Sequence, residues 1–226
     1  IVMLMDNRLQ YFIDWLQNNV THFAALVTEG SVATNDPIQP GYSDNDLQIV
    51  VYDDVMHEMQ AVKERLTANP LGDTYLLSPR LYSEYIHGDS LNDLSLKFRA
   101  KVLAGRDVVA EKEAPNQEIA QKIGKDGLTY LVKRLERRWL NVAHWSDDYA
   151  RHKNYEVYKN FFVFYAALHY GKTGAYPRSR ADVARTIPNK ELAHNVLLVT
   201  NNIATASKAQ QNVALESAIT IIQNIK

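Results

Sequence analysis

The most informative segment of the chain reads Gly30-Ser31-Val-Ala-Thr-Asn-Asp-Pro-Ile-Gln-Pro-Gly-Tyr-Ser-Asp44-Asn-Asp46-Leu-Gln-Ile-Val-Val51. A turn of small residues ends one apolar run, and a loop rich in Pro, Gly and Asn follows. Asp44 and Asp46 then stand at the start of a second apolar run. Side chains on a strand alternate between its two faces, so the two carboxylates point the same way from Cα atoms about 6.5–7 Å apart.

Two carboxylates on one face favour Mg²⁺, which takes oxygen ligands, keeps several waters and shares its remaining coordination with substrate phosphates. They could also serve a pair of metal ions, which lie about 3.5–4 Å apart in phosphoryl-transfer sites. Gly30 and Ser31 would let backbone N–H groups and a hydroxyl approach a phosphate closely. The alternative is a hairpin with a solvated acidic turn, because Asp-x-Asp alone is not specific. The combination with the Gly-Ser turn favours the metal site.

The whole pattern resembles the signature of nucleotidyltransferases related to DNA polymerase beta. An apolar strand ends in Gly-Ser, a loop follows, and Ser-Asp-x-Asp runs into Leu-Gln-Ile-Val-Val. Asn45 departs from this family, which more often has an apolar residue between the acids. The resemblance implies that Gly30, Ser31 and Ser43 bind the nucleotide and that Asp44 and Asp46 bind Mg²⁺ or Mn²⁺.

The composition narrows the class of protein. The chain has 226 residues, of which 46% are hydrophobic, and this is enough for one large domain or two small ones. The formal net charge of −1 provides no global basic field, which argues against a nucleic-acid partner. With no cysteine, the chain has no disulfide framework and no thiolate site, and this fits a cytoplasmic protein.

The apolar runs are all shorter than the roughly 20 residues of a membrane span, so no membrane partner is expected. The first residues, Ile-Val-Met-Leu-Met-Asp, lack the basic flank of a signal peptide. Because the sequence does not open with Met, we also expect that residues precede Ile1.

Hydrophobic spacing predicts an α+β fold. In the N-terminal part, Leu4, Leu9, Phe12, Ile13 and Leu16 predict a helix over 3–19. The further expected elements are strands at 23–28, 47–52 and 73–78, the last closed by Pro79, and a helix over 55–68. Together these describe a small mixed sheet with helices packed against it.

The second half predicts a helical bundle. A helix over 92–101 leads to a composition shift near 110–116, from which we predict a catalytic domain at 1–112 and a helical domain at 113–226. The expected helices of the bundle cover 116–147, 154–170, 179–186 and 189–224.

Sites of this kind usually have a third acid, which helps to hold metal or takes the proton from the attacking hydroxyl. Asp73 is the candidate for both roles, because a neighbouring strand can bring it beside Asp44 and Asp46; the alternative is a residue that caps the turn after Gly72. Glu136 is a second candidate for the base, against the alternative of a solvated salt-bridge partner on a helix rich in Arg and Lys.

The segment from Phe161 to Arg185 combines an apolar helix, a Gly-rich turn and a basic helix start. It resembles the corresponding element of aminoglycoside nucleotidyltransferases of the kanamycin and streptomycin/spectinomycin types, and Leu94–Asp107 is similar to the link between their domains. The resemblance covers most of residues 20–186. It implies transfer of a nucleoside monophosphate, with AMP the first candidate, from a metal-bound nucleoside triphosphate such as ATP to a hydroxyl of a small molecule, which releases pyrophosphate.

In that family a basic residue near Arg178 or Arg180 binds phosphate, and a guanidinium can do so bidentately. The alternative is that both arginines lie on the surface beside the turn. A polycationic acceptor such as an aminoglycoside needs acids and aromatic faces. Candidates for binding it are Trp145, Asp147, Asp148 and Glu156, against the alternative of an N-capped loop with core aromatics.

Two other functions remain open from the sequence. One is a nucleotidyltransferase that modifies a partner protein, as small antitoxin-type members do. The other is a nucleotide-binding regulator that has lost catalysis. Many relatives in the resembled family are dimers, so a homodimer is a further expectation.

Overall fold

The structure is a computed structural model that describes residues 7–39, 41–42, 45–53, 55–68, 71 and 75–225. The fold is α+β, with a small mixed sheet and many helices. The chain divides into two compact units. The first comprises Ile1–Thr34, Asp44–Gly88 and Ser95–Ala114, and the second comprises Asn35–Ser43, Asp89–Leu94 and Pro115–Lys226. Two short segments from the N-terminal half therefore belong to the helical unit.

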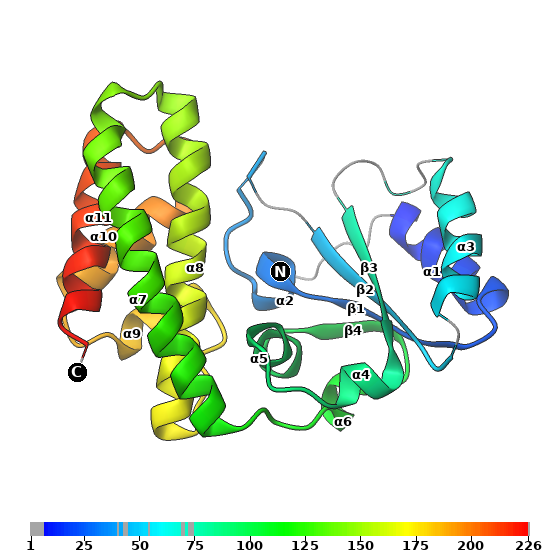
Figure 1. The fold of residues 1–226 in the computed structure, drawn as a ribbon. Coiled ribbons are helices and arrows are strands. Elements are labelled where there is room, and N and C mark those ends of the chain that lie inside the picture. The colour runs from blue at the N-terminus through cyan, green and yellow to red at the C-terminus, as the bar shows by residue number, and fades with distance from the viewer. Residues whose placement is uncertain are drawn as a thin grey trace. The chain divides into compact units, whose positions relative to one another are not determined.

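The first unit contains a four-stranded sheet in the order β3-β2-β1-β4 (Figure 1). The strands are β1 (Phe23–Thr28), β2 (Asn45–Val51), β3 (Tyr75–Leu81) and β4 (Lys101–Gly105). β1 is antiparallel to both β2 and β4, whereas β2 and β3 are parallel. The predicted mixed sheet is thus confirmed.

Each face of the sheet carries its own apolar core, because successive residues of a strand point to opposite sides. One core joins Leu47, Ile49 and Val51 of β2 to α1 (Asn7–Asn19) and α3 (Val55–Leu66). The other joins Val27 and Val50 to Tyr85, Leu96 and Val108, which come from α4 (Tyr82–Ile86), α5 (Leu91–Phe98) and α6 (Val108–Glu111). The sheet is therefore covered on both sides.

The first helix follows its predicted spacing, since Leu9, Phe12, Ile13 and Leu16 are all buried. Leu4 and the other residues of the predicted helix that precede Asn7 lie outside the described residues. β3 differs from the prediction, because it continues through Pro79 instead of ending there. An edge strand tolerates a proline, whose missing N–H need not pair, and β3 is the edge strand beside β2. The segment after 100 forms the edge strand β4, which the sequence analysis missed.

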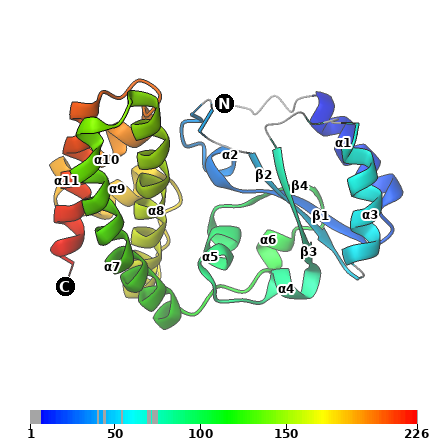
Figure 2. The ribbon, with the colours of Figure 1, turned by 45° about the horizontal axis from the view of Figure 1, so that its top comes forward.

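The second unit is a helical bundle (Figure 2). It comprises α7 (Gln117–Asn141), a 3₁₀ turn (Val142–His144), α8 (Asp147–Thr173), α9 (Arg180–Thr186), α10 (Lys190–Asn201) and α11 (Lys208–Gln223). None of the helices in the described part of the chain combines the length and the apolar character that a membrane crossing requires.

Three helix predictions in the bundle differ from the structure. The helix predicted over 154–170 is α8, which begins earlier, at Asp147. The helix predicted over 116–147 ends at Asn141, and α8 begins at Asp147 because the Ser146 side chain accepts a hydrogen bond from Tyr149 N. The helix predicted over 189–224 is two helices. Ser207 and Gln210 form a capping box that starts α11 anew.

Helices α7 and α8 lie side by side in both views and are in unusually close contact (Figures 1 and 2). A Cβ added at Gly124 would overlap the backbone of Leu168, and one added at Gly171 would overlap the backbone of Gln121. Glycine is normally unfavourable inside a helix, but here it allows two backbones to approach. The bundle therefore depends on these glycines.

We predict that Gly124→Ala destabilises the protein by about 1–3 kcal/mol, as overpacking does, although the same change in a solvent-exposed helix stabilises. Thermal unfolding measures the effect. Lys125→Ala, at the exposed neighbouring position, is the control and should change stability by less than about 0.5 kcal/mol. A more stable Gly124→Ala protein would show that the two helices are not in backbone contact.

Candidate functional site

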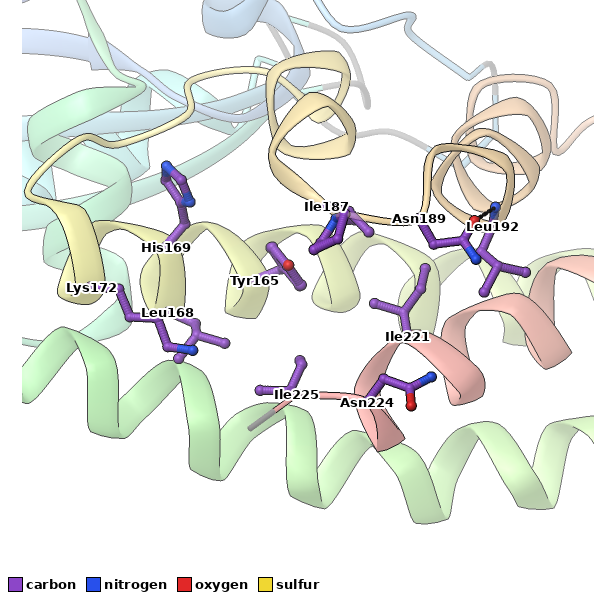
Figure 3. A pocket seen from close by; sticks show the side chains of 11 residues that line it. Tyr165, Leu168, His169, Lys172, Ile187, Asn189, Leu192, Ile221, Asn224 and Ile225 are labelled. Carbon is purple, nitrogen blue, oxygen red and sulfur yellow. Dashed lines mark hydrogen bonds between the residues drawn. The ribbon is translucent and has the colours of Figure 1, made fainter.

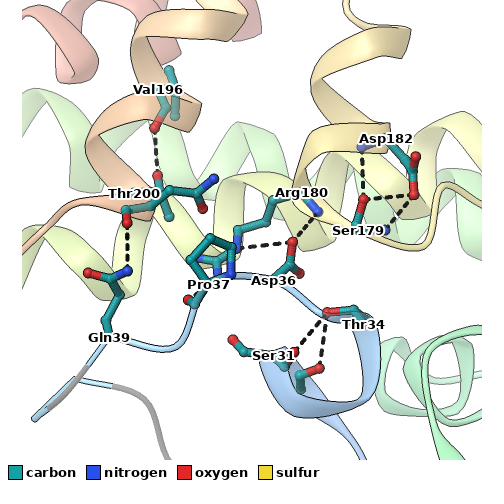
Figure 4. A network of polar contacts seen from close by, with 12 residues as sticks. Ser31, Thr34, Asp36, Pro37, Gln39, Ser179, Arg180, Asp182, Val196 and Thr200 are labelled. Atoms are coloured by element: carbon teal, nitrogen blue, oxygen red, sulfur yellow. Dashed lines mark hydrogen bonds and ion pairs between the residues drawn. The ribbon is translucent and has the colours of Figure 1, made fainter. Parts of the chain in front are cut away.

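Gly30 forms a tight turn between β1 and the short helix α2 (Gly30–Thr34). Its φ of 74° is one that residues with a side chain rarely adopt, and a Cβ at this position would lie 3.3 Å from Asp46 Oδ2. The Thr34 hydroxyl closes the turn by donating to Gly30 O at 3.2 Å (Figure 4). The turn backbone therefore lies close to the Asp46 carboxylate.

The strand register places a second acid beside Asp46. Thr28 of β1 pairs with Leu47 of β2, and the next residue, Glu29, donates its N–H to Asp46 O at 3.0 Å. Residues opposite each other in an antiparallel pair share a face, so the Glu29 and Asp46 side chains emerge on the same side of the sheet. Sequence analysis missed Glu29; the available signal was an acid immediately before the Gly-Ser turn.

Gln48 of β2 joins Glu29 and Asp46 as a third polar side chain on this face. It lies two residues after Asp46 and so on the same face, and its Nε2 donates to Glu29 Oε1 at 2.8 Å. The side chain is only 6% exposed, and its Oε1 has no hydrogen-bond partner among the described residues. A buried amide oxygen without a donor is unfavourable in an otherwise folded protein.

Burial is the main factor that disfavours the ionised form of Glu29. Desolvation raises the pKa of Glu29, and the neighbouring Asp46 charge adds to this; the Gln48 hydrogen bond and the positive charges of Arg80 and Arg99 act against it. The carboxyl group thus keeps a pKa above its ordinary value of 4.5. Ionised Glu29 therefore lowers the stability of the folded protein.

Several predicted site residues lie outside the part of the chain that the structure describes. These are Ser43 and two of the three predicted metal ligands, Asp44 and Asp73. Within the described ranges, no group of three or more His, Cys, Asp or Glu side chains could hold a metal ion. The oxygen groups described near the Gly30 turn are the carboxylates of Asp46 and Glu29 and the Gln48 amide oxygen, which has no hydrogen-bond partner among the described residues; such oxygens are the ligand type of a hard divalent cation.

We predict that Glu29→Gln stabilises the metal-free protein at neutral pH. With its pKa raised on folding, native Glu29 binds a proton more tightly than unfolded Glu29, so its ionisation lowers stability as pH rises above about 4.5. The variant should match wild type near pH 4 and have the higher melting temperature at pH 8.

Thermal unfolding between pH 4 and 8 in the presence of a chelator measures this difference. Glu64→Gln, at an exposed position of α3, is the matched control. A Glu29→Gln protein less stable than wild type at pH 8 would contradict the assignment of an unfavourable charge.

Arg180 is buried and anchors the loop between the Gly30-Ser31 turn and Asp46 (Figure 4). Its backbone N–H donates to Asp36 Oδ1 at 2.9 Å, its Nε lies 3.6 Å from the same oxygen, and its Nη2 donates to Pro37 O at 3.0 Å. The alternative that both arginines lie on the surface is therefore wrong for Arg180. Its contacts here are with the chain segment Asn35–Ser43, which belongs to the helical unit.

Two further contacts hold the same loop. Gln39 Nε2 donates to Asn201 O at 2.6 Å, and the Tyr42 ring lies 5.2 Å from the His152 ring and 5.8 Å from the Tyr155 ring. The loop that joins Gly30 to Asp46 is therefore fixed by side chains of the bundle along most of its described length.

We predict that Arg180→Met destabilises the protein by about 3–5 kcal/mol, because it leaves the Asp36 carboxylate buried without this cation. Arg178→Met, two residues earlier at an exposed position, is the control and should change unfolding by less than about 0.5 kcal/mol. Equal melting temperatures for the two variants would contradict the anchoring role.

The other predicted residues lie on the exterior of the helical unit. Arg178 is exposed, and so is Glu136 on α7. Three of the four predicted acceptor-binding residues are acids that face cations of the same unit: Asp147 with Lys208, Asp148 with Arg151, and Glu156 with Arg134. The fourth, Trp145, packs edge-on against Tyr149 and lies beneath the Arg138 guanidinium.

The helical unit also contains a cavity of about 340 Å³ (Figure 3). Apolar side chains form most of its wall, with Tyr165, His169 and Lys172 of α8 and with Asn189 and Asn224 at its edge. Burial lowers the pKa of His169, which favours the neutral imidazole. Its lining contains no carboxylate, so the cavity offers none of the acid ligands found around Gly30.

Comparison with known proteins gives one informative likeness. No family model and no curated protein matches the sequence. The structure is similar to that of the spectinomycin adenyltransferase AAD(9) from Enterococcus faecialis, solved with ATP and spectinomycin. The TM-score is 0.53 at 13% identity, and the match covers 96% of this chain and 98% of that chain. This likeness establishes a shared fold, including the helical C-terminal part.

Proposed function

We propose that this chain, which has the fold of a spectinomycin adenyltransferase, is itself a nucleotidyltransferase. It would transfer a nucleoside monophosphate, AMP in the first instance, from a nucleoside triphosphate to a hydroxyl group of a small molecule. The observation that carries the proposal is the left-handed Gly30 turn packed against the Asp46 carboxylate. In this arrangement backbone N–H groups can approach a phosphate while the carboxylate holds its cation.

Asp46, with Asp44 and Asp73, would hold a divalent cation, Mg²⁺ or Mn²⁺. The residues described around Asp46 fit such an ion, since they offer oxygen donors, a buried amide oxygen without a donor, and a backbone turn that a Cβ would obstruct. The ion would neutralise charge on the phosphates. A Cβ at position 30 would lie 3.3 Å from Asp46 Oδ2, so glycine lets the turn approach this carboxylate. The Ser31 and Ser43 hydroxyls would donate to the triphosphate.

A positive side chain would complete the phosphate site. We assign this role to the exposed Arg178 rather than to Arg180, whose guanidinium lies against Asp36 and Pro37. The acceptor hydroxyl would attack the α-phosphorus in line, so that a new P–O bond forms as the bond to pyrophosphate breaks. Asp73 or Glu136 would take the hydroxyl proton. Most of the acceleration would come from positioning and charge neutralisation.

For the acceptor we propose a hydroxylated small molecule that carries positive charge, with spectinomycin, a ligand in the similar structure, as the first compound to test. Asp147, Asp148 and Glu156 are exposed acids that could exchange their present cationic partners for those of a ligand, and Trp145 offers an aromatic face. Exposed ion pairs contribute little to stability, so such an exchange would cost the fold little.

We predict a Mg²⁺-dependent melting shift with the right nucleoside triphosphate. Ligand at 100 times its Kd stabilises the fold by about 2.7 kcal/mol, which corresponds to roughly 5–10 °C for a chain of this size. Asp46→Asn should abolish both this shift and pyrophosphate release. Asp126→Asn, an exposed acid of α7, is the control and should retain both.

Acceptors are then screened with the best nucleotide by pyrophosphate release. Full activity in Asp46→Asn would refute the site. Labelling of a partner protein without turnover of any small molecule would favour the protein-modifying alternative. A melting shift with a nucleotide but no transfer to any acceptor would favour a nucleotide-binding regulator that has lost catalysis.

A further inference from the structure

We infer that Glu29 supplies a further carboxylate to the divalent-cation site at Asp46, held in orientation by Gln48. This inference rests on the proposed function and adds a ligand that the Asp-x-Asp pattern does not contain. It is carried by three features around Asp46: the strand register, the hydrogen bonding of Gln48, and the absence of an ion pair to Glu29 within the described part of the chain.

The register places Glu29, the residue that follows β1, opposite Asp46. It lies directly across from Asp46, to which its N–H is bonded at 3.0 Å, and it immediately precedes the Gly30 turn. Cβ atoms of opposed residues in antiparallel strands are about 4.5–5.5 Å apart. Two carboxylates at that separation on one face can reach one ion, and the Gly30 turn borders the same space.

Gln48 fixes the orientation of the Glu29 carboxylate. Its Nε2 donates to Glu29 Oε1 at 2.8 Å, and no donor among the described residues reaches the other carboxylate oxygen. Gln48 Oε1 is itself buried without a donor. An unpartnered carboxylate oxygen and an unpartnered amide oxygen on one face, next to Asp46, match the hard oxygen donors that a divalent cation prefers.

The competing explanation is that Glu29 is an internal counter-charge for Arg80 and Arg99. Both guanidinium groups are close enough to act on it electrostatically. Neither forms an ion pair with Glu29 within 4.0 Å in the described structure. Arg80 Nη2 donates a hydrogen bond to Glu84 O at 3.4 Å. A structural ion pair is normally in direct contact, so the geometry favours the ligand role.

The test is Mn²⁺ binding by the full chain, measured from free Mn²⁺ in electron paramagnetic resonance, with Mn²⁺ alone and with a non-hydrolysable ATP analogue. We expect Glu29→Gln to weaken Mn²⁺ binding at least tenfold and Gln48→Leu to weaken it several-fold. Glu64→Gln, the exposed glutamate of α3, should change it less than twofold. Melting temperatures measured without metal verify that each variant is folded.

Wild-type affinity in Glu29→Gln, or no Mn²⁺ binding by wild type under either condition, would overturn the inference. A loss of Mn²⁺ affinity in Glu29→Gln that is equalled by Arg80→Met would also overturn it, because it would identify a structural ion pair. If Glu29→Gln weakens Mn²⁺ binding but wild type transfers no nucleotide to any acceptor, the ligand assignment stands and the proposed function fails.

Discussion

The close approach of the Gly30 backbone to the Asp46 carboxylate is the constraint on which the rest of the site depends. It requires a residue without Cβ, a positive φ at the end of β1, and an antiparallel β2 in a register that brings Asp46 to the same end. The two apolar cores on either face of the sheet hold that register, since a slip of one residue would turn every core side chain to the wrong side. In the first unit, the packing of the two cores therefore also determines the geometry of the site.

The polar group around Asp46 is arranged against stability. Glu29 is desolvated, and the Gln48 amide oxygen is buried without a donor, although an apolar pair at these positions would satisfy the strand ladder equally well. In the helical unit a buried cation and a buried carboxylate lie together instead. Arg180 donates its backbone N–H to Asp36 and places its guanidinium 3.6 Å from the same carboxylate oxygen, and this contact holds the segment that separates the Gly-Ser turn from the acids. We therefore propose a ligand-binding role for the cluster around Asp46, whereas the Arg180–Asp36 contact holds a chain segment.

Much of this could be predicted from local sequence. Helical spacing identified the buried face of α1, and the run after Asp46 identified β2, because both patterns are set by a single element. Features that depend on contacts between distant parts of the sequence could not be predicted in this way. The burial of Arg180 depends on Asp36, far away in sequence, and the role of Glu29 depends on which residue of β2 it faces. The break between α7 and α8 was predicted after 147, whereas α7 ends at Asn141 and α8 begins at Asp147. Apolar spacing did not locate this boundary, which the Ser146 side-chain cap marks.

The central claim is that the space between the Gly30 turn and Asp46 binds a metal-bound nucleotide. A crystal structure of the chain with Mn²⁺ and a non-hydrolysable nucleoside triphosphate tests it most directly, because anomalous scattering locates the ion independently of the phosphates. The account predicts a manganese peak on the Asp46 carboxylate, with phosphate oxygens against the backbone of Gly30 and Ser31. A nucleotide bound elsewhere, in the α8–α11 cavity for example, with no manganese at Asp46, would contradict it.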